Sequence, residues 1–407
     1  MKVLLISGEF PPLIGGVGDY TACLAASLCD MGVQVAVLTS RAAGRSAFPF
    51  PVRAEVPNWD FGCWARVRRE IARHRPDLVH IQYQAAAYGL HPAINLLPAL
   101  LRLTDRGIRA LVTFHDLRVP YVFPKAGPLR EKMLRLMARG CRGVICTDAA
   151  DLDSVSRWSL RSRAFLIPIG SNIPVAPADP KAPAAPGSSA EALPGRLDGV
   201  CANVLCQEDV LILGYFGLLN QSKGVELLLR AYHLVRQRGK SLRLVMIGAD
   251  LGDSDPTNVA YARRVRAMAS ELDVDGSICW TGRLTAADTS RALQGLDFCV
   301  LPYVDGASFR RGTLMAALSH GLPVITTAPS YHPVGGDGPS LSDGENCRLV
   351  LPGDVGQLAE AIEELASSVS LRERLAAGAI DLARHFTWGE IARQTVAAYA
   401  AILSSGP

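Results

Sequence analysis

The sequence predicts two α/β domains, each built on an open parallel β-sheet. Short apolar runs that are typical of buried strands alternate with segments of helical periodicity in both halves of the chain. A stretch rich in Pro, Ala and Gly, residues 176–208, separates these halves and predicts a linker. We therefore expect a first domain over residues 1–175, a second over 209–385, and a closing helix over 386–407 that packs back toward the first domain.

Composition limits the class of protein. Apolar residues make up 49% and charged residues 20% of the 407 residues, as in globular proteins. No run of about 18 uncharged apolar residues is present, so no membrane-spanning helix is expected. The first twelve residues indicate a strand rather than a secretory signal. The ten cysteines contain no Cys-x-x-Cys pair, which predicts buried reduced thiols, no structural zinc and a cytoplasmic location.

Charge is unevenly distributed along the chain. Residues 1–175 hold 22 Lys+Arg and 13 Asp+Glu, a net charge of +9, whereas the remainder holds 20 and 25, a net charge of −5. The basic excess lies in residues 65–75, 129–143 and 157–163. These stretches are either ordinary amphipathic surface helices or a surface attracted to an anionic acceptor or to the inner face of an anionic membrane. No basic groove interleaved with aromatic residues indicates a nucleic-acid partner.

In the first domain, polar residues follow the predicted strands. Lys2–Ser7 is the first strand, and the glycine-rich turn after it leads into a helix over residues 19–31, so a ligand is expected to approach Gly16 closely. Later strands are expected at residues 33–38, 78–81, 110–114, 143–146 and 165–167. Candidate side chains at their carboxyl ends are Tyr83, Gln84, His115, Asp116 and Asn172. Parallel strands end at one edge of a sheet, so these residues are expected to line one rim of a cleft.

The second domain repeats the pattern. Its strands are expected at residues 211–216, 242–247, 278–281, 298–301 and 322–325, and its helices at 225–237, 286–294, 314–318 and 359–375, before a last helix over 390–403. The stretch 297–327 is a strand, a loop, a helix and a strand. Its loop and helix start contain Asp305, Ser308, Arg310, Arg311, Gly312 and Thr313. Unpaired N–H groups, a helix dipole and two arginines suit a phosphate, although the arginines could be surface charge.

Several longer motifs occur in a fixed order. The first half contains GGVGDYTACLAASLCDMGVQVAVLT, TFHD and IPIGSN, and the second contains GYFGLLNQSKGVELLLRA, ICWTGRL, LDFCVLPY, GLPVITT and FTWGEIA. On these motifs the chain resembles the retaining nucleotide-sugar glycosyltransferases of family 4 (group 1), over nearly its whole length outside the linker. The resemblance implies the GT-B fold, in which two Rossmann-like domains face each other across a cleft. The donor then binds mostly to the second domain and the acceptor mostly to the first.

The resemblance also implies a reaction. A hexose moves from a nucleoside-diphosphate sugar, which is a co-substrate rather than a cofactor, to a hydroxyl of a polysaccharide, glycolipid or small acceptor. Gly16 matches the glycine near the donor phosphates, His115 the histidine near the transferred sugar, and Lys223 the lysine of the phosphate-binding pair. No catalytic metal is expected, because cations and a helix dipole can stabilise the departing diphosphate.

Three charged positions of the family's pattern are changed in this chain. Leu218 stands at the position of the phosphate-binding arginine, and Ser308 and Ala316 stand at those of two glutamates. We expect Arg310, Arg311 or Arg283 to restore the positive charge and Asp305 to supply a carboxylate at the catalytic centre. The alternatives are a transferase-like protein that binds a nucleotide sugar or a partner without turnover, and an epimerase of the same fold.

Overall fold

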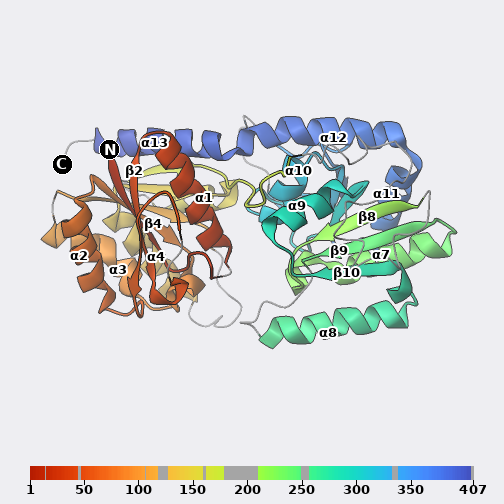
Figure 1. The fold of residues 1–407 in the computed structure, drawn as a ribbon, viewed down its shortest axis with the longest axis horizontal. Helices are drawn as coiled ribbons and strands as arrows, with labels where there is room; N and C mark the ends of the chain where they lie inside the picture. The colour runs from red at the N-terminus through yellow and green to blue at the C-terminus, as the bar shows by residue number, and fades with distance from the viewer. Residues whose placement is uncertain are drawn as a thin grey trace. The chain divides into compact units, whose positions relative to one another are not determined.

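The chain forms two compact units, as seen in a computed structural model (Figure 1) that describes residues 1–13, 15–44, 47–105, 107–117, 127–158, 162–177, 210–248, 256–331 and 338–404. One unit comprises Met1–Asn172 with Phe386–Pro407, and the other comprises Ile173–His385. Most of the predicted linker, residues 176–208, lies outside the described residues. The prediction of two parallel α/β sheets is confirmed.

The first unit contains a seven-stranded parallel sheet with the order β3-β2-β1-β4-β5-β6-β7. Its strands are β1 (Lys2–Ser7), β2 (Gln34–Ser40), β3 (Val52–Val56), β4 (Leu78–Tyr83), β5 (Arg109–Phe114), β6 (Gly143–Cys146) and β7 (Arg163–Leu166). β1 lies inside the sheet, where Ile6 pairs with Leu38 of β2 and with Ile81 of β4. The sequence did not predict β3, whose burial is mostly partial because it forms the edge of the sheet.

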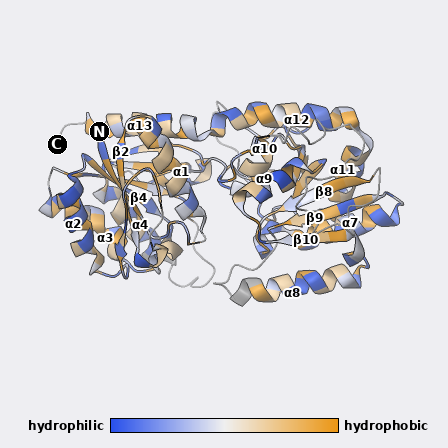
Figure 2. Cartoon of the chain, viewed as in Figure 1, coloured by the Kyte–Doolittle hydropathy of each residue, from blue (hydrophilic) through white to orange (hydrophobic). Residues whose placement is uncertain are grey.

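Helices cover both faces of this sheet. They are α1 (Gly16–Asp30), α2 (Cys63–His74), α3 (Ala93–Thr104), α4 (Gly127–Gly140), α5 (Ala149–Ser156) and the closing helix α13 (Trp388–Leu403). Alternate residues of β1 enter two separate cores: Leu4 and Ile6 pack with α2, α3 and α4, whereas Val3 and Leu5 pack with α1 and α13. The run Val3–Ile6 of β1 is apolar and buried at every position, as expected for a strand that is covered on both faces, and orange predominates in the middle of this sheet in Figure 2.

The second unit contains a six-stranded parallel sheet with the order β10-β9-β8-β11-β12-β13. The strands are β8 (Leu211–Phe216), β9 (Leu242–Ile247), β10 (Ile278–Gly282), β11 (Phe298–Leu301), β12 (Val324–Thr327) and β13 (Arg348–Val350). The helices are α7 (Val225–Gln237), α8 (Pro256–Glu271), α9 (Ala286–Gln294), α10 (Gly312–Ser319), α11 (Val355–Ser367) and α12 (Val369–Ala383). β8 and β11 are neighbours, so the loops after these two strands also adjoin.

Two sequence-based expectations differ from the structure. The single helix expected over residues 359–375 is instead α11 and α12, which meet at Ser368. The hydroxyl of Ser368 accepts a hydrogen bond from the N–H of Leu371 and so begins α12. Reduced thiols were expected throughout, but Cys279 is disulfide-bonded. Seven described cysteines carry free thiols: Cys23, Cys29, Cys63, Cys141, Cys146, Cys299 and Cys347.

Candidate functional site

The polar rim expected in the first unit follows from its sheet order. β4, β5, β6 and β7 are adjacent and parallel, so their carboxyl ends share one edge. Gln84, His115 and Asp116 lie half-buried just after β4 and β5, and Asn172 is half-buried after β7. The amide Nδ2 of Asn172 donates to Oδ2 of Asp19 in α1 at 3.0 Å. The predicted rim residues therefore gather at one end of this sheet.

Tyr83 does not belong to that exposed rim. β4 continues to Tyr83, which is 4% exposed, and its hydroxyl accepts a hydrogen bond from Nδ2 of Asn95 at 3.0 Å. Its ring lies edge-on to Phe114 in the core. We predicted Tyr83 as an acceptor-binding residue, but its position is that of a core tyrosine whose hydroxyl is already bonded.

His115 is held by contacts on two sides. Its Nε2 atom lies 2.9 Å from Oε1 of Gln82, and its ring meets that of Tyr20 edge-on with 4.6 Å between centroids. Tyr20 in turn packs against Trp388 of α13. Burial lowers the pKa of His115 to about 3, so the imidazole is neutral at physiological pH. A neutral imidazole can hold a hydroxyl group but does not supply a positive charge.

Gln82, His80 and Tyr399 support His115, and the sequence analysis assigned them no role. All three are fully buried in the first unit. His80 lies between Tyr399 and Gln82, within hydrogen-bond distance of both. The polar residues His80 and Gln82 within an otherwise mostly apolar strand were the signal available in the sequence, because buried polar side chains require partners.

The N-terminus of α1 already holds a carboxylate. Oε1 of Glu9 accepts hydrogen bonds from the N–H groups of Val17 and Gly18 at 3.0 and 3.2 Å. Burial raises the pKa of Glu9, and these two bonds oppose that increase. Gly16, the predicted phosphate-approach residue, is exposed, and an added Cβ there would meet nothing within 4 Å. A phosphate approaching Gly16 would therefore meet the negative charge of Glu9.

In the second unit, two of the predicted cations converge on Tyr303. The Arg311 guanidinium lies 4.8 Å, and the Lys223 ammonium 5.2 Å, from the centroid of the Tyr303 ring. Lys223 Nζ also donates to Oγ1 of Thr313 at 3.4 Å, and the Tyr303 hydroxyl lies 2.7 Å from the same oxygen. Arg311 and Lys223, which are 88 positions apart in sequence, thus flank the start of α10.

Local backbone geometry brings Lys223 to this place. Gly224, which follows it, has a φ of +68° and lies so close to Pro302 that an added Cβ would be 1.9 Å from the carbonyl oxygen. The N–H of Val304 donates to the carbonyl of Ser222 at 3.1 Å. Glycine is required at position 224 because another residue would push apart the loops after β8 and β11.

This cluster brings together two cations, Lys223 and Arg311, and one carboxylate, Asp305. Burial and the nearby charge of Arg311 lower the pKa of Lys223 to about 8, while Asp305 opposes that shift. Asp305 forms an ion pair with Arg311. Nε of Arg311 is buried with no hydrogen-bond partner in the part of the chain that the structure describes. No side chain caps α10, so its first N–H groups, at Gly312 and Thr313, remain available to an anion.

Other predicted donor residues lie at varying distances from this cluster. Ser308 Oγ accepts a hydrogen bond from the N–H of Arg310 at 3.4 Å within the same loop. Arg283 is exposed after β10, and β10 is separated from β11 by β9 and β8. Three strand spacings amount to roughly 14 Å, so Arg283 does not join the cluster. Leu218 is exposed and Ala316 is fully buried. Because both side chains are apolar, neither replaces the charge that the family's pattern carries at its position.

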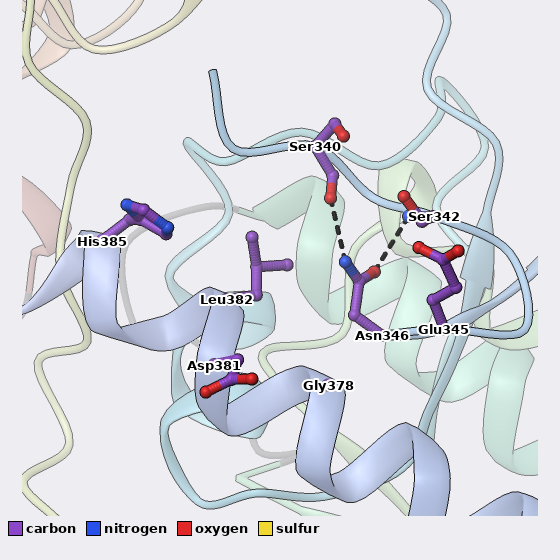
Figure 3. Close-up of a pocket in the computed structure, with 8 residues that line it drawn as sticks. All are labelled: Ser340, Ser342, Glu345, Asn346, Gly378, Asp381, Leu382 and His385. Carbon is purple, nitrogen blue, oxygen red and sulfur yellow. Dashed lines mark hydrogen bonds between the residues drawn. The ribbon is translucent and has the colours of Figure 1, made fainter. Parts of the chain in front are cut away.

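A shallow hollow lies elsewhere in the second unit (Figure 3). It is lined by Ser340, Ser342, Glu345, Asn346, Gly378, Asp381, Leu382 and His385. Asn346 is occupied there, since it donates to the carbonyl of Ser340 and accepts from the N–H of Ser342. No predicted site residue lines this hollow, and the candidate site remains the cluster around Tyr303.

The described residues contain neither a cluster of metal ligands nor a membrane-spanning helix. No three His, Cys, Asp or Glu side chains come together there as metal ligands would. None of the described helices combines the length and the apolar character that crossing a bilayer requires.

Several arginines of the basic stretches are paired with carboxylates: Arg68 with Asp105, Arg73 with Glu55 and Glu70, and Arg135 with Glu131.

The two parallel α/β sheets are those expected of a GT-B glycosyltransferase, and comparison with known families gives the same class. Residues 14–173 match the family described as Glycosyltransferase Family 4, and residues 210–368 match the family described as Glycosyl transferases group 1. The two matches together cover most of the chain, one in each unit. The chain therefore belongs to the family 4, group 1 glycosyltransferases.

Individual relatives are distant. The phosphatidyl-myo-inositol mannosyltransferase of Mycobacterium leprae is 26% identical over 409 residues, which covers 96% of this chain and 94% of that protein. A D-inositol 3-phosphate glycosyltransferase of Stackebrandtia nassauensis is 27% identical over 199 residues. That second match spans 47% of this chain and only 42% of the relative.

Solved structures share the fold. A sucrose-phosphate synthase from Thermosynechococcus elongatus superposes with a TM-score of 0.74 at 18% identity, with full coverage of both chains. Anabaena HepE in complex with UDP-glucose superposes with a TM-score of 0.72 at 17% identity, covering 98% of this chain and all of that one. Both likenesses agree with the GT-B class of fold.

Proposed function

We propose that this protein is a retaining glycosyltransferase that moves a hexose from a nucleoside-diphosphate sugar to a hydroxyl acceptor. The observation that carries the proposal is the pair of cations, Lys223 and Arg311, on one aromatic ring beside the uncapped start of α10. A diphosphate needs charged donors on both phosphates. Arg311 takes the role that the family's pattern gives to an arginine at position 218, and Lys223 keeps its own.

The chemical demand falls on the leaving group. The bond between the anomeric carbon and the diphosphate oxygen breaks, and its electron pair stays on the diphosphate. A new bond forms to the acceptor oxygen on the same face of the sugar, and the acceptor proton passes to the diphosphate. Fixed cations and helix N–H groups stabilise the growing negative charge without rearranging during the reaction. In this proposal Lys223, Arg311, Gly312 and Thr313 do that work without a metal ion.

His115 binds rather than transfers a proton in this scheme. Its low pKa, about 3, keeps it neutral, and a neutral imidazole can accept a hydrogen bond from a sugar hydroxyl. Asp305 is paired with Arg311, which supports a role in holding that cation rather than a direct role at the sugar. Gln84, Asp116 and Asn172 remain the proposed acceptor contacts.

The acceptor class follows from charge and from the relatives. A relative that matches over 96% of this chain is named a phosphatidyl-myo-inositol mannosyltransferase, a name that contains an inositol phospholipid. The net charge of +9 over residues 1–175 suits an acceptor that is itself anionic or is embedded in an anionic surface. We therefore propose a glycolipid or polyol hydroxyl, reached by peripheral association with a membrane.

A second candidate is a protein that binds a nucleotide sugar without turnover. The observation that favours it is the absence of a carboxylate at Ser308 and Ala316, because a hydroxyl and a methyl group cannot replace two glutamates. Both candidates require donor binding. They differ only in whether the glycosidic bond forms.

One experiment tests the donor and then the reaction. The full chain is heated with a panel of nucleoside diphosphates and their sugars, and the true donor is expected to raise the Tm by mass action. That donor is then incubated with lipid and polyol acceptors, and the anomeric configuration of any product is read by NMR. A product with the donor's configuration supports the transferase. A Tm increase without any product supports the binder, and no Tm increase with any nucleotide contradicts both.

A further inference from the structure

A continuous chain of hydrogen bonds runs through the first unit from α13 to His115. The hydroxyl of Tyr399 lies 2.7 Å from Nδ1 of His80. Nε2 of His80 lies 3.2 Å from Nε2 of Gln82, and Oε1 of Gln82 lies 2.9 Å from Nε2 of His115. The Thr113 hydroxyl, 2.7 Å from Nε2 of His80, branches from the chain. Four of these side chains come from two adjacent strands, β4 and β5, or the loop after β5, and the fifth comes from the last helix.

Hydrogen-bond roles along the chain are determined by the amide of Gln82. With the Gln82 amide oriented as in the structure, its nitrogen can only donate, so Nε2 of His80 accepts. The Thr113 hydroxyl then also donates to Nε2, and the His80 proton is on Nδ1, facing Tyr399. An amide oxygen only accepts, so the proton of His115 is on Nε2. The tautomer of one histidine therefore determines the tautomer of the other through a single side chain.

Burial makes this arrangement difficult to change in part. His80, Gln82, Thr113 and Tyr399 are all fully buried, so no member can exchange its partner for bulk water. Rotating the Gln82 amide alone would set donor against donor at one end and acceptor against acceptor at the other. The edge-on contact with Tyr20 restrains the His115 ring as well.

Nδ1 of His115 is the one ring nitrogen left over. Among the described residues it has no hydrogen-bond partner, and it is not one of the buried unsatisfied atoms. With the proton on Nε2, Nδ1 carries a lone pair. It can accept from a hydroxyl but cannot donate to a carbonyl or a phosphate oxygen.

We propose that Gln82 is a positioning residue, and that Tyr399 and His80 fix its amide so that His115 presents the Nδ1 lone pair to a ligand hydroxyl. The ligand part of this inference rests on the proposed function, whereas the tautomers themselves do not. Tyr399 thereby gives the closing helix a role at His115 in addition to its packing against α1.

Histidine tautomers can be read directly in the full chain without any donor or acceptor. Selective ¹⁵N-histidine labelling and long-range ¹H–¹⁵N correlation distinguish protonation at Nδ1 from protonation at Nε2, and His80→Gln and His115→Gln spectra assign the two rings. The expected result for the parent protein is Nδ1–H at His80 and Nε2–H at His115. The reverse pattern at either ring would overturn the proposal.

Two substitutions test the coupling. Gln82→Glu offers two accepting oxygens, so His115 should keep its proton on Nε2 while His80 moves its proton from Nδ1 to Nε2. Tyr399→Phe removes the partner of His80 Nδ1, so both histidines should shift toward mixed tautomers. Unchanged spectra in both variants would show that the chain of bonds does not couple the rings.

A matched control separates this effect from general loosening of the fold. Tyr232 is also fully buried, and its hydroxyl donates to the carbonyl of Leu242 at 2.8 Å in the second unit. Tyr232→Phe should leave both histidine signals unchanged, and a shift as large as that of Tyr399→Phe would overturn the proposal. Once a donor and acceptor are known, Gln82→Met should lower kcat/KM at least tenfold, with recovery in Gln82→Glu. If the tautomers behave as expected but no donor binds, only the proposed function fails.

Discussion

Arg311 and Asp305 form an ion pair in the loop between β11 and α10, with side chains 14% and 34% exposed. The pair restrains a cation that is otherwise next to another cation, Lys223. An incoming diphosphate offers Arg311 more negative charge than one carboxylate does. We infer that donor binding exchanges one anionic partner of Arg311 for another, so the affinity measured for a donor is a difference between two ionic interactions.

Arg311 should therefore contribute more to donor affinity than its neighbour Arg310. Removing a charged partner from a desolvated phosphate costs about 2–5 kcal/mol, or roughly 30-fold or more in affinity. Calorimetry against the nucleoside diphosphate of the true donor compares Arg311→Ala with Arg310→Ala, which serves as the adjacent matched control. Equal binding by Arg311→Ala and the parent would mean that the cluster on Tyr303 is not the diphosphate site.

Asp305→Asn distinguishes two roles for that carboxylate. If Asp305 mainly restrains Arg311, its neutralisation frees the guanidinium and should increase the affinity for inorganic pyrophosphate severalfold. If Asp305 instead contacts the nucleoside or sugar, the variant should bind pyrophosphate as the parent does and the nucleoside diphosphate more weakly. The structure favours the first result, and a titration with each of the two ligands decides between them.

Lys223 should take up a proton when the donor binds near pH 8. Its pKa is lowered from 10.5 to about 8, so about half of the molecules carry a neutral lysine at that pH. A bound diphosphate favours the charged form and raises the pKa again. Calorimetry at pH 8 in buffers of different ionisation enthalpy should report an uptake approaching half a proton, and at pH 6 almost none.

The control for this measurement is Lys223→Arg. An arginine stays charged throughout this range, so the variant should bind without proton uptake. Uptake that persists in the variant would have to come from another group.

The lowered pKa of Lys223 also makes the free energy of unfolding rise with pH between about 8 and 10.5, because only the unfolded chain still binds the lysine proton in that range.

Sequence reasoning predicted the sheets better than the side-chain partners. Strand periodicity and polar strand ends sufficed for β4 and β5, because parallel strands buried on both faces leave a strong pattern. Lys223 was recognisable from a motif, but the shared ring of Tyr303 was not, since it depends on how two loops adjoin. Tyr83 was misjudged because β4 runs two residues past its predicted end at residue 81, which places this side chain in the sheet rather than on the rim.

The basic surface of the first unit yields a prediction that needs no donor. Part of its charge is neutralised by ion pairs such as Arg68–Asp105, while Arg69, Lys132 and Arg139 are exposed. The full chain should float with anionic vesicles in low salt and lose that binding as ionic strength increases. Lys132→Glu combined with Arg139→Glu should weaken flotation, whereas Arg384→Glu in the turn after α12 should not. Equal flotation with neutral vesicles would mean that charge does not drive the association.

Glu9 and Gly15 should be strongly coupled in stability. The backbone of Gly15 is extended, a conformation open to any residue, but an added Cβ would lie 2.1 Å from the Glu9 carboxylate. Gly15→Ala must therefore displace the carboxylate from the N–H groups of Val17 and Gly18, and Glu9→Ala removes the same two bonds. Each variant should lose about 1–2 kcal/mol in the free energy of unfolding, as when a helix cap is removed.

The double variant distinguishes this coupling from two separate defects. Once Glu9 is an alanine, the methyl group at position 15 has nothing to displace, so the double variant should be no less stable than Glu9→Ala alone. Urea unfolding of the four proteins provides the cycle. If the two losses add, the carboxylate does not occupy the start of α1 in solution. The N–H groups there would then be available to a phosphate approaching Gly16.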